Sequence, residues 1–523
     1  MRAAATVVTF AAIACGSPPI EPVGDAAPHD DRMGVLAFGG DVFLARFAHT
    51  RVDQDGYGKP LVSVADVFDE ADLGLVNLEA VVSSRGRATP KQGERNSYLF
   101  RGRPDLVRVL TEAGVDVITG GNNHSGDYGG EAIAEQMQIL TRAGIGYVGI
   151  GEDRHDAARY RLFEAGDVVV ALLGADTTTP EFAAGDGAGT LFLDEGDPDH
   201  FVSVVADEAA RAREYADVVL FTAHWGPNLA PRPTEARREL AAGLIRDAGV
   251  DGILGHSAHA VQGMEIIDGR PVIYDGGNLM LDYDGDGWTH KSALFRLELS
   301  PRGVEAVEPI PIRLHHTRTE RADGETTDEL LNRFVELSQE FDPRFTLIDG
   351  AVLLDPPWEH PPPPARPSQV GPPPFQAVPE KGEIEPASVV DAPPSDLLEI
   401  GHRFSSGATL IGARPLPQSA RRGHGFFVTT YWKTDQPIDE SYLMTVRLRP
   451  DGEDGPVWAN SDTYRDHHPG DWSYPTTLWE PGEIIEDRYF VRGHGDAAAT
   501  SHELSIGLSS QGEVPLGDVV ITD

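Results

Sequence analysis

The sequence predicts an α/β domain over residues 33–354, followed by an all-β sandwich domain over residues 396–523. Three observations support this division. Short apolar runs alternate with stretches of helical periodicity up to residue 354, a proline-rich segment occupies residues 355–395, and short β-branched and aromatic runs come after it. With 523 residues, the chain is long enough to bury more than one hydrophobic core.

The amino terminus has the pattern of an export signal. Arg2 supplies a positive charge, "AAATVVTFAAIA" supplies an apolar stretch too short to span a bilayer, and small residues precede Cys15. Residues 1–15 therefore resemble a bacterial lipoprotein signal peptide, with a plain secretory signal as the alternative. Residues 16–32 are expected to be a flexible tether. We expect an exported protein, anchored by lipid to a cell-envelope membrane in the periplasm or at the cell surface.

The acidic composition excludes two classes of partner. The chain has 83 acidic and 43 basic residues, which gives a formal net charge of −40. Because like charges repel, nucleic acid and anionic membrane surfaces are not expected to bind. Cys15 is the only cysteine, so no disulfide can form within the chain.

The α/β domain is predicted from seven apolar runs and the helical stretches between them. The predicted strands are "GVLAFGGD", "ADLGLVNLE", "GVDVITGGNNH", "DVVVALLGAD", "ADVVLFTAHWG", "GVDGILGHSAH" and "RPVIYDGGN". Helical spacing is found in stretches such as "RPDLVRVLTEA", "GGEAIAEQMQILTRA" and "PTEARRELAAGLIRDA". A last helix, "TTDELLNRFVELSQEF", and a strand near "FTLIDGAVLL" close the domain. The proline density of the following segment predicts a semi-rigid extended linker.

Polar residues gather where the predicted strands end. In chain order they are Asp41, Asn77, Glu79, Asn122, Asn123, His124, His224, His256, His259 and Asn278. Ligands of open α/β sheets bind just outside the carboxyl ends of the strands, so these side chains are expected to converge on one site. Carboxylates, an amide oxygen and imidazoles without a thiolate suit Mn²⁺, Zn²⁺ or Fe²⁺. About six such ligands are enough for two divalent ions, and this predicts metal-dependent hydrolysis.

The ordered series "GGD…NLE…GNNHSGD…HWG…GHSAHAVQG…YDGGN" resembles the CapA family of poly-γ-glutamate capsule synthesis proteins, within the calcineurin-like metallophosphoesterase superfamily. The resemblance covers residues 33–354 and implies a four-layer sandwich. It also implies a set of metal ligands, namely Asp41, Glu79 as the bridging carboxylate, Asn123, His224, His256 and His259. His124 would be the catalytic histidine, and Asp127 would orient it.

Four further residues are predicted to contact substrate, namely Asn122, Asn278, Trp225 and Arg46. Several site residues also have a structural alternative. Asn122, Asn123 and Asn278 could form turns, His256 and His259 could be surface or helix-capping histidines, and Trp225 could be a packing residue. Many metallophosphoesterases have a histidine two residues after the first aspartate, in an Asp-x-His pair. Phe43 stands at that position here, so one ion would lack a histidine ligand.

The resemblance implies a role in making, anchoring or trimming an extracellular polymer such as poly-γ-glutamate. The expected substrate is an anionic polymer or a phosphoester, and the expected partner is a capsule synthase complex in the membrane. Two alternatives remain. One is a non-catalytic scaffold for capsule assembly, and the other is a carbohydrate-binding surface lipoprotein that uses aromatic residues of the β domain: Tyr431, Trp432, Trp472, Tyr474 and Trp479.

A second acidic motif, "DYDGDGW" at residues 282–288, has the spacing of the start of a calcium loop. Ala293 stands where that loop needs a closing carboxylate. A solvated acidic loop is therefore the other interpretation.

Overall fold

The computed structural model describes most of the chain from Arg32 onward. The described residues are 32–89, 91, 98–348, 350–354, 359, 389–422, 424–440, 442–450, 459–461, 476–493 and 499–523. The predicted signal peptide with Cys15, the tether up to residue 31 and most of the predicted linker lie outside these residues. Within the described part of the chain, no helix is both long and apolar enough to cross a membrane.

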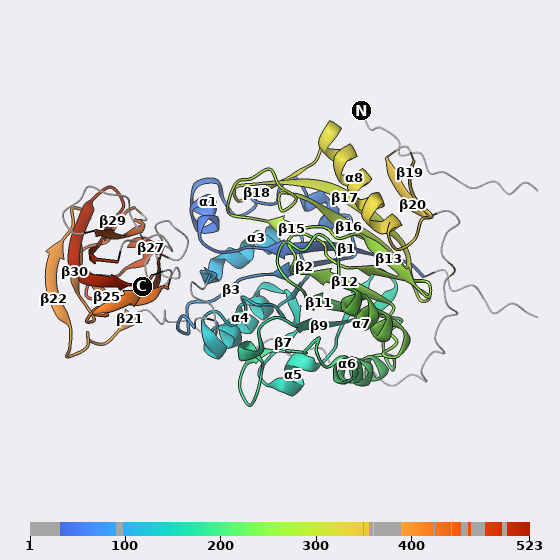
Figure 1. Ribbon diagram of the computed structural model, residues 1–523, viewed down its shortest axis with the longest axis horizontal. Coiled ribbons are helices and arrows are strands. Elements are labelled where there is room, and N and C mark those ends of the chain that lie inside the picture. Colours follow the sequence, from blue (N-terminus) through green and yellow to red (C-terminus); the bar gives the residue numbers. More distant parts are fainter. Residues whose placement is uncertain are drawn as a thin grey trace, which may run out of the picture. The chain divides into compact units, whose positions relative to one another are not determined.

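The first sheet has eight strands and mixed direction (Figure 1). Its spatial order is β18 (Arg318–Arg321), β17 (Gly303–His315), β16 (Lys291–Ser300), β1 (Gly34–Val42), β2 (Leu73–Leu78), β5 (Val117–Thr119) and β6 (Gly146–Val148), with β15 (Asn278–Met280) also paired to β1. The strands from β1 to β6 run parallel, whereas β16, β17 and β18 extend the sheet as antiparallel neighbours. The parallel strands therefore direct their carboxyl ends to one edge.

The second sheet has six strands around a parallel centre. Its spatial order is β13 (Met264–Ile267), β14 (Arg270–Ile273), β12 (Gly252–His256), β11 (Val218–His224), β9 (Val168–Asp176) and β8 (Arg161–Ala165). β9, β11, β12 and β14 are parallel, and only the two edge strands are antiparallel.

The two sheets face each other across one apolar core. On β1, Leu36 and Phe38 belong to this core together with Val170 and Leu172 of β9. Ala37, which lies between the two β1 residues, belongs to a different core on the outer face. Because successive side chains of a strand point to opposite faces, each sheet has one face toward its partner and one toward helices.

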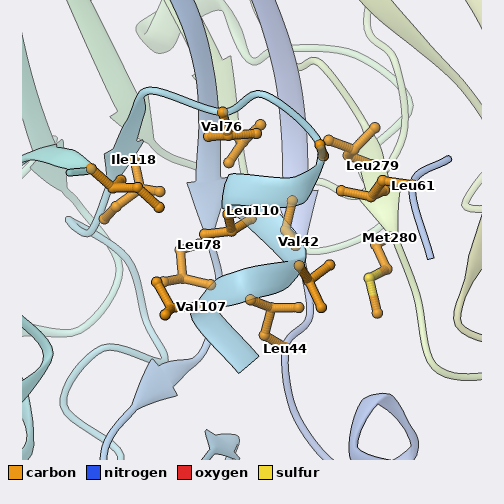
Figure 2. Close-up of a cluster of buried hydrophobic side chains, with 14 of the residues drawn as sticks. Val42, Leu44, Leu61, Val76, Leu78, Val107, Leu110, Ile118, Leu279 and Met280 are labelled. Carbon is orange, nitrogen blue, oxygen red and sulfur yellow. The ribbon is translucent and has the colours of Figure 1, made fainter. Parts of the chain in front are cut away.

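Helices cover the outer face of the first sheet. They are α1 (Phe47–Asp55), α2 (Ala65–Asp69), the 3₁₀ turn η1 (Pro104–Leu106), α3 (Val107–Glu112) and α4 (Gly129–Ala143). Figure 2 shows Val107 and Leu110 of α3 beside Val76 and Leu78 of β2, all within the same buried cluster. This packing holds the β2 strand that leads to Glu79.

The outer face of the second sheet is covered by α5 (Arg154–Ala158), α6 (Pro198–Ala212) and α7 (Glu235–Arg246). A last long helix, α8 (Gly324–Gln339), adds Phe334 and Val335 to the core between the sheets. The smaller elements are β3 (Val81–Val82) with β4 (Arg101–Gly102), β7 (Ile150–Gly151) with β10 (Gly189–Thr190), η2 (Pro180–Phe182), and the hairpin β19 (Phe345–Ile348) with β20 (Ala351–Leu354).

The carboxy-terminal region is built from strands with one short 3₁₀ turn, η3 (Thr476–Leu478), among its described residues. Ten strands form one sheet: β22 (Leu398–Arg403), β23 (Ala408–Ala413), β25 (Phe426–Thr434), β28 (Ile484–Gly493), β27 (Ala459–Ser461), β26 (Met444–Pro450), β29 (Ser501–Leu508), β30 (Gly512–Thr522) and β24 (Ser419–Arg421), with β21 (Val389–Val390) paired to β28. Leu410 and Ile506, from strands far apart in that order, share one core, so the sheet curls around its own apolar face.

The prediction of an α/β domain followed by a β-rich region is confirmed. Two details differ from the prediction. Strand pairing begins at Val389, inside the range predicted as linker, and the described strands of the carboxy-terminal region are linked in one continuous sheet rather than two. In the first region the cores show the layer order helix, sheet, sheet, helix. Membership in the calcineurin-like superfamily stays a prediction.

Candidate metal centre

Four strands bring carboxylates and imidazoles to one edge of the facing sheets. Asp41 lies near the end of β1, Glu79 directly follows β2, and His224 and His256 are the last residues of β11 and β12. Since β1 pairs in parallel with β2, and β11 with β12, the ends of each pair lie together. All four side chains are fully buried.

Glycine at position 40 allows a close backbone approach behind Asp41. The Asp41 backbone N–H donates to the Gly277 carbonyl at 2.9 Å. A Cβ atom on Gly40 would lie 1.8 Å from that same carbonyl oxygen. Only glycine therefore fits at the second position of the "GGD" motif. The close approach there lets the backbone of β1 bond to the "GGN" loop.

Two groups of three side chains have ligand atoms within 4.8 Å of one another: Asp41 with His224 and His256, and Asp41 with Glu79 and His259. His259 Nδ1 lies 2.9 Å from Asp41 Oδ2 and 3.7 Å from Glu79 Oε2. His224 Nε2 lies 3.9 Å from Glu79 Oε1. Asp41 belongs to both groups, and Glu79 faces a histidine of each. The bridging role predicted for Glu79 stays a prediction, since either carboxylate lies between the groups.

Several buried polar atoms of this region have no hydrogen-bond partner among the described residues. They include Glu79 Oε1 and Oε2, His224 Nε2, and Asn123 Oδ1 on the turn that follows β5. Buried polar atoms nearly always have a partner, so such a cluster indicates a missing ligand. Carboxylate oxygens, an amide oxygen and an imidazole nitrogen are donors that divalent cations accept. The side chains therefore fit a divalent metal centre.

The protonation of the imidazoles agrees with that fit. Burial lowers the pKa of His224 well below its usual value and lowers the pKa of His256 to about 4, so both are neutral and able to coordinate. Burial alone would lower the pKa of His259 as well, but the Glu79 and Asp41 carboxylates raise it to about 10. Burial and the Asp41 charge raise the pKa of Glu79. Without a cation, the proton on His259 thus offsets the Asp41 carboxylate, and the raised pKa of Glu79 favours its neutral form.

The predicted catalytic histidine is held by its predicted orienter. His124 Nδ1 lies 2.6 Å from Asp127 Oδ2, which also accepts the Phe100 backbone N–H at 2.7 Å. The Phe100 ring packs on the imidazole with centroids 4.2 Å apart. His124 Nε2 lies 4.0 Å from Glu79 Oε1, so the nitrogen that Asp127 leaves free faces the metal-binding groups.

Sequence reasoning missed two charged residues of the site. Lys91 is buried, with Nζ 3.4 Å from His124 Nδ1 and 3.8 Å from Asp127 Oδ1. The rarity of lysine could have drawn attention to Lys91, because the sequence has only five lysines among 43 basic residues. Asp275 is also fully buried, and burial with the Asp41 charge raises its pKa to about 8. It stands three residues before Asn278, within the "YDGGN" motif.

The two asparagines predicted to contact substrate are engaged in holding neighbours. Asn122 Nδ2 donates to Asn77 Oδ1 at 3.0 Å and to the Leu78 carbonyl at 2.8 Å, and its Oδ1 accepts the His124 backbone N–H. Asn278 Oδ1 lies 3.1 Å from His259 Nδ1, and its Nδ2 donates to the His259 carbonyl. Both amides therefore position histidines, and substrate contact by either stays a prediction.

The other two residues predicted to contact substrate, Trp225 and Arg46, lie in different surroundings. Trp225 is 1% exposed, and its Nε1 donates to the Tyr274 carbonyl at 2.8 Å. A side chain so enclosed packs the core and presents no face to a substrate, which corrects the predicted contact. Arg46 forms a buried ion pair with Asp282, and its guanidinium lies 4.6 Å from the Phe100 ring centroid, on the ring that packs on His124.

Phe43 occupies the position of the missing histidine as a packing residue. Its ring centroid lies 5.7 Å from that of His259 and 5.2 Å from that of Phe100. The structure thus gives the Asp41–Glu79–His259 group an apolar wall where a further imidazole would stand.

The calcium-loop interpretation of "DYDGDGW" is not supported by its three carboxylates, because each faces a separate protein partner. Asp282 pairs with Arg46, Asp284 accepts the His316 backbone N–H at 2.9 Å, and Asp286 pairs with Arg313 at 3.1 Å.

The aromatic residues of the carboxy-terminal region pack its core. Tyr431, Trp432 and Trp479 are at most 2% exposed. Trp472 and Tyr474 lie outside the described residues. The three described rings therefore favour core packing over a sugar-stacking face.

Comparison with known proteins points to one family. Residues 35–283 match the family described as bacterial capsule synthesis protein PGA_cap. The PGA biosynthesis protein CapA of Bacillus subtilis is 28% identical over 291 residues, covering 55% of this chain and 73% of that protein. A probable polyglutamine synthesis accessory protein of Mycobacterium tuberculosis is 29% identical over 286 residues, covering 52% and 73%. The capsule biosynthesis protein CapA of Bacillus anthracis is 25% identical over 301 residues, covering 56% and 71%.

Among solved structures, a β-glucosidase from Listeria innocua aligns with 74% of this chain and 50% of its own chain at 14% identity. The TM-score of 0.16 is too low to indicate a shared fold. The family match spans the region that holds Asp41, Glu79 and the clustered histidines, and the named relatives agree with it. Through residues 35–283 the chain therefore belongs to the CapA family of bacterial capsule synthesis proteins.

Proposed function

We propose that this protein is an exported accessory protein of capsule polymer synthesis that binds two divalent cations and hydrolyses or transfers a bond of the polymer. The names of its relatives support the link to capsule and polyglutamate synthesis. The observation that carries the catalytic part is the set of buried ligand atoms without a hydrogen-bond partner on Glu79, Asn123 and His224. A purely structural core would satisfy such atoms.

The ligands would divide between the two groups. His259 would help to hold one cation, His224 and His256 with Asn123 the other, and Asp41 and Glu79 would reach both. Bound cations of this kind polarise a scissile carbonyl or phosphoryl group and lower the pKa of water. The contribution of the chain itself is His124. Its Nδ1 bond to Asp127 leaves Nε2 free to exchange a proton with the reacting group on the side of Glu79.

The substrate is proposed to be an extracellular anionic polymer of the poly-γ-glutamate type, with a phosphoester as the other substrate class that the centre could serve. Both substrates are anionic, whereas the chain has a net charge of −40. Cations in the centre, with the buried Lys91 beside His124, would offset that charge locally.

The test pairs metal analysis with activity. The purified protein should contain about two equivalents of a divalent metal. With Mn²⁺ added it should hydrolyse either an aryl phosphodiester or poly-γ-glutamate. His124→Ala should retain the metal and lose the activity, because His124 does not belong to either group of clustered ligands. Metal-free protein that stays inert after addition of Mn²⁺, Zn²⁺ or Fe²⁺ would contradict the proposal.

One observation favours a second function. Phe43 provides an apolar wall in place of a histidine, which is the kind of loss expected in a metallo-fold retained as a scaffold for a capsule synthase. In that case the protein would bind the synthase complex without turnover. Copurification with the synthase that survives both His124→Ala and removal of metal would support this function.

We also propose that Cys15 is the lipid attachment site and that the exported protein stands at a cell-envelope membrane. The support is the sequence of residues 1–15 alone. Membrane fractionation of the wild type and of Cys15→Ala tests it. The variant should move to the soluble exported fraction, and an unchanged distribution would argue against the anchor.

A further inference from the structure

We propose that Asp275 is a positioning residue that sets the cation affinity of the Asp41–Glu79–His259 group without setting that of His224 and His256. The inference rests on the proposed metal centre. It assigns a function to a buried carboxylate outside the ligand groups, and it predicts that the two cations bind unequally.

Asp275 joins two loops that bear site residues. Its Oδ2 accepts the Ala258 backbone N–H at 2.6 Å, and its Oδ1 accepts the Gly277 backbone N–H at 2.8 Å. Ala258 directly precedes His259, and Gly277 directly precedes Asn278. The side chain is fully buried, so water does not replace either bond.

The histidines of the two groups are held by different means. His224 and His256 are register partners on adjacent parallel strands, so the sheet fixes their backbones. His259 lies outside any strand, with φ of +60°, and Ser257 has φ of +113°. Residues with side chains rarely adopt these conformations, which persist only where surrounding contacts impose them. The two Asp275 bonds are among those contacts.

The same carboxylate also supports the partners of His259. Asn278 Oδ1 lies 3.1 Å from His259 Nδ1, and the Gly277 carbonyl accepts the Asp41 backbone N–H at 2.9 Å. Loss of the Asp275 bond to Gly277 would therefore loosen Asn278 as well as His259, whereas Asp41 stays paired with Asn77 between β1 and β2. Among the described contacts, the Asp275 carboxylate bonds to neither His224 nor His256, whose backbones are fixed by the pairing of β11 with β12.

The test variant is Asp275→Asn, which keeps the side-chain shape but places an amide N–H₂ against a backbone N–H. Loss of an outer partner of a metal ligand typically weakens metal affinity by about 10–100-fold. We expect that loss in one of the two binding steps only. His259→Ala should remove the same step, and this identifies which cation is affected.

Asp176→Asn is the matched control. Asp176 is equally buried, and its register partner on β11 is His224. Among the described residues, its carboxylate accepts hydrogen bonds only from Thr178 and Thr179 of its own turn. The control therefore makes the same change from a buried carboxyl to an amide near the centre without touching the His259 loop. Its effect on the His259 step should stay below about threefold, well short of the loss expected from an outer ligand partner.

The experiment is a Mn²⁺ titration of the full chain, stripped of metal beforehand and followed by calorimetry with elemental analysis. Two steps in the wild type, with only one weakened at least tenfold in Asp275→Asn, would support the proposal. Equal weakening of both steps, or an unchanged titration, would overturn it. A wild type that binds no Mn²⁺ would instead refute the metal centre itself, before any variant is considered.

Folding of the variant is checked by thermal unfolding without metal. If Asp275→Asn fails to fold, Asp275→Ser replaces it, because a hydroxyl still accepts one backbone N–H. We then expect the His259 step to weaken and the His224–His256 step to stay at its wild-type affinity. Wild-type affinity for both steps in Asp275→Ser would overturn the proposal.

Discussion

The Nδ1 atom of His259 lies 2.9 Å from the Oδ2 atom of Asp41, although 218 positions separate the two residues in the sequence. This contact joins the first strand of the first sheet to a loop at the end of the second. The Oδ1 atom of Asp41 also lies 3.7 Å from Nδ1 of His256, so Asp41 connects the two groups of metal-binding side chains. Four predictions test this arrangement, and a fifth tests the burial of Trp225.

Asp41→Asn should weaken binding of both cations, because Asp41 belongs to both groups of ligands. His256→Ala should weaken only one, because it belongs to a single group. The measurement is metal stoichiometry by elemental analysis after dialysis against a fixed free metal concentration. If Asp41→Asn still binds one full equivalent of metal, Asp41 does not coordinate both cations.

Cation binding should release protons, and the apparent affinity should rise with pH. The pKa of His259 is raised to about 10 by the neighbouring carboxylates, so at pH 7 its imidazole is protonated in the metal-free protein. A cation must displace that proton, and one released proton corresponds to about tenfold in affinity per pH unit. Calorimetry in buffers of different ionisation enthalpy counts the protons between pH 6 and 8. His259→Ala should flatten the slope.

The same shift makes a prediction for stability without metal. Because the folded-state pKa of His259 is above its usual 6.5, its contribution to the free energy of unfolding is fully present below pH 6.5. It is lost as pH rises from there through about 10. Urea unfolding of wild type and His259→Ala should show a difference that shrinks with rising pH, and a difference that grows would contradict the assignment.

Phe43→His should tighten the binding of one cation. The Phe43 ring lies 5.7 Å from the His259 ring, so an imidazole at this position can reach the Asp41–Glu79–His259 group. Burying a polar ring among Phe100 and its neighbours should also lower the free energy of unfolding by about 1–3 kcal/mol without metal. Phe43→Leu is the control, with a similar loss of packing and no gain in affinity. Equal affinities in the two variants would show that position 43 does not face the cation.

Trp225→Phe should destabilise the protein and leave its metal content unchanged. The indole is buried and its Nε1 donates to the Tyr274 carbonyl, which the variant leaves without that donor. The lost hydrogen bond and the space left behind should lower the free energy of unfolding by about 1–3 kcal/mol. Urea unfolding measures this loss. Unchanged stability with a raised KM would restore the substrate contact.

The sequence by itself determined the main helices and strands and the positions of the site residues at the strand ends. Alternating apolar runs and helical spacing are local properties, so "GVLAFGGD" and "ADVVLFTAHWG" predict β1 and β11 without knowledge of their neighbours. Because parallel strands share one carboxyl edge, the polar residues at their ends could be expected to converge. The structure brings Asp41, Glu79, His224, His256 and His259 together as that rule predicts.

Only the tertiary structure decided which partner each side chain has. It buries Trp225 in the core, pairs Arg46 with Asp282, and places Lys91 beside His124 and Asp127. It also places Asp275 between the His259 and Asn278 loops, a function that its position in the sequence does not indicate. These contacts depend on sheet register and on how two sheets pack, and both bring together residues too distant in the chain for any local pattern to relate.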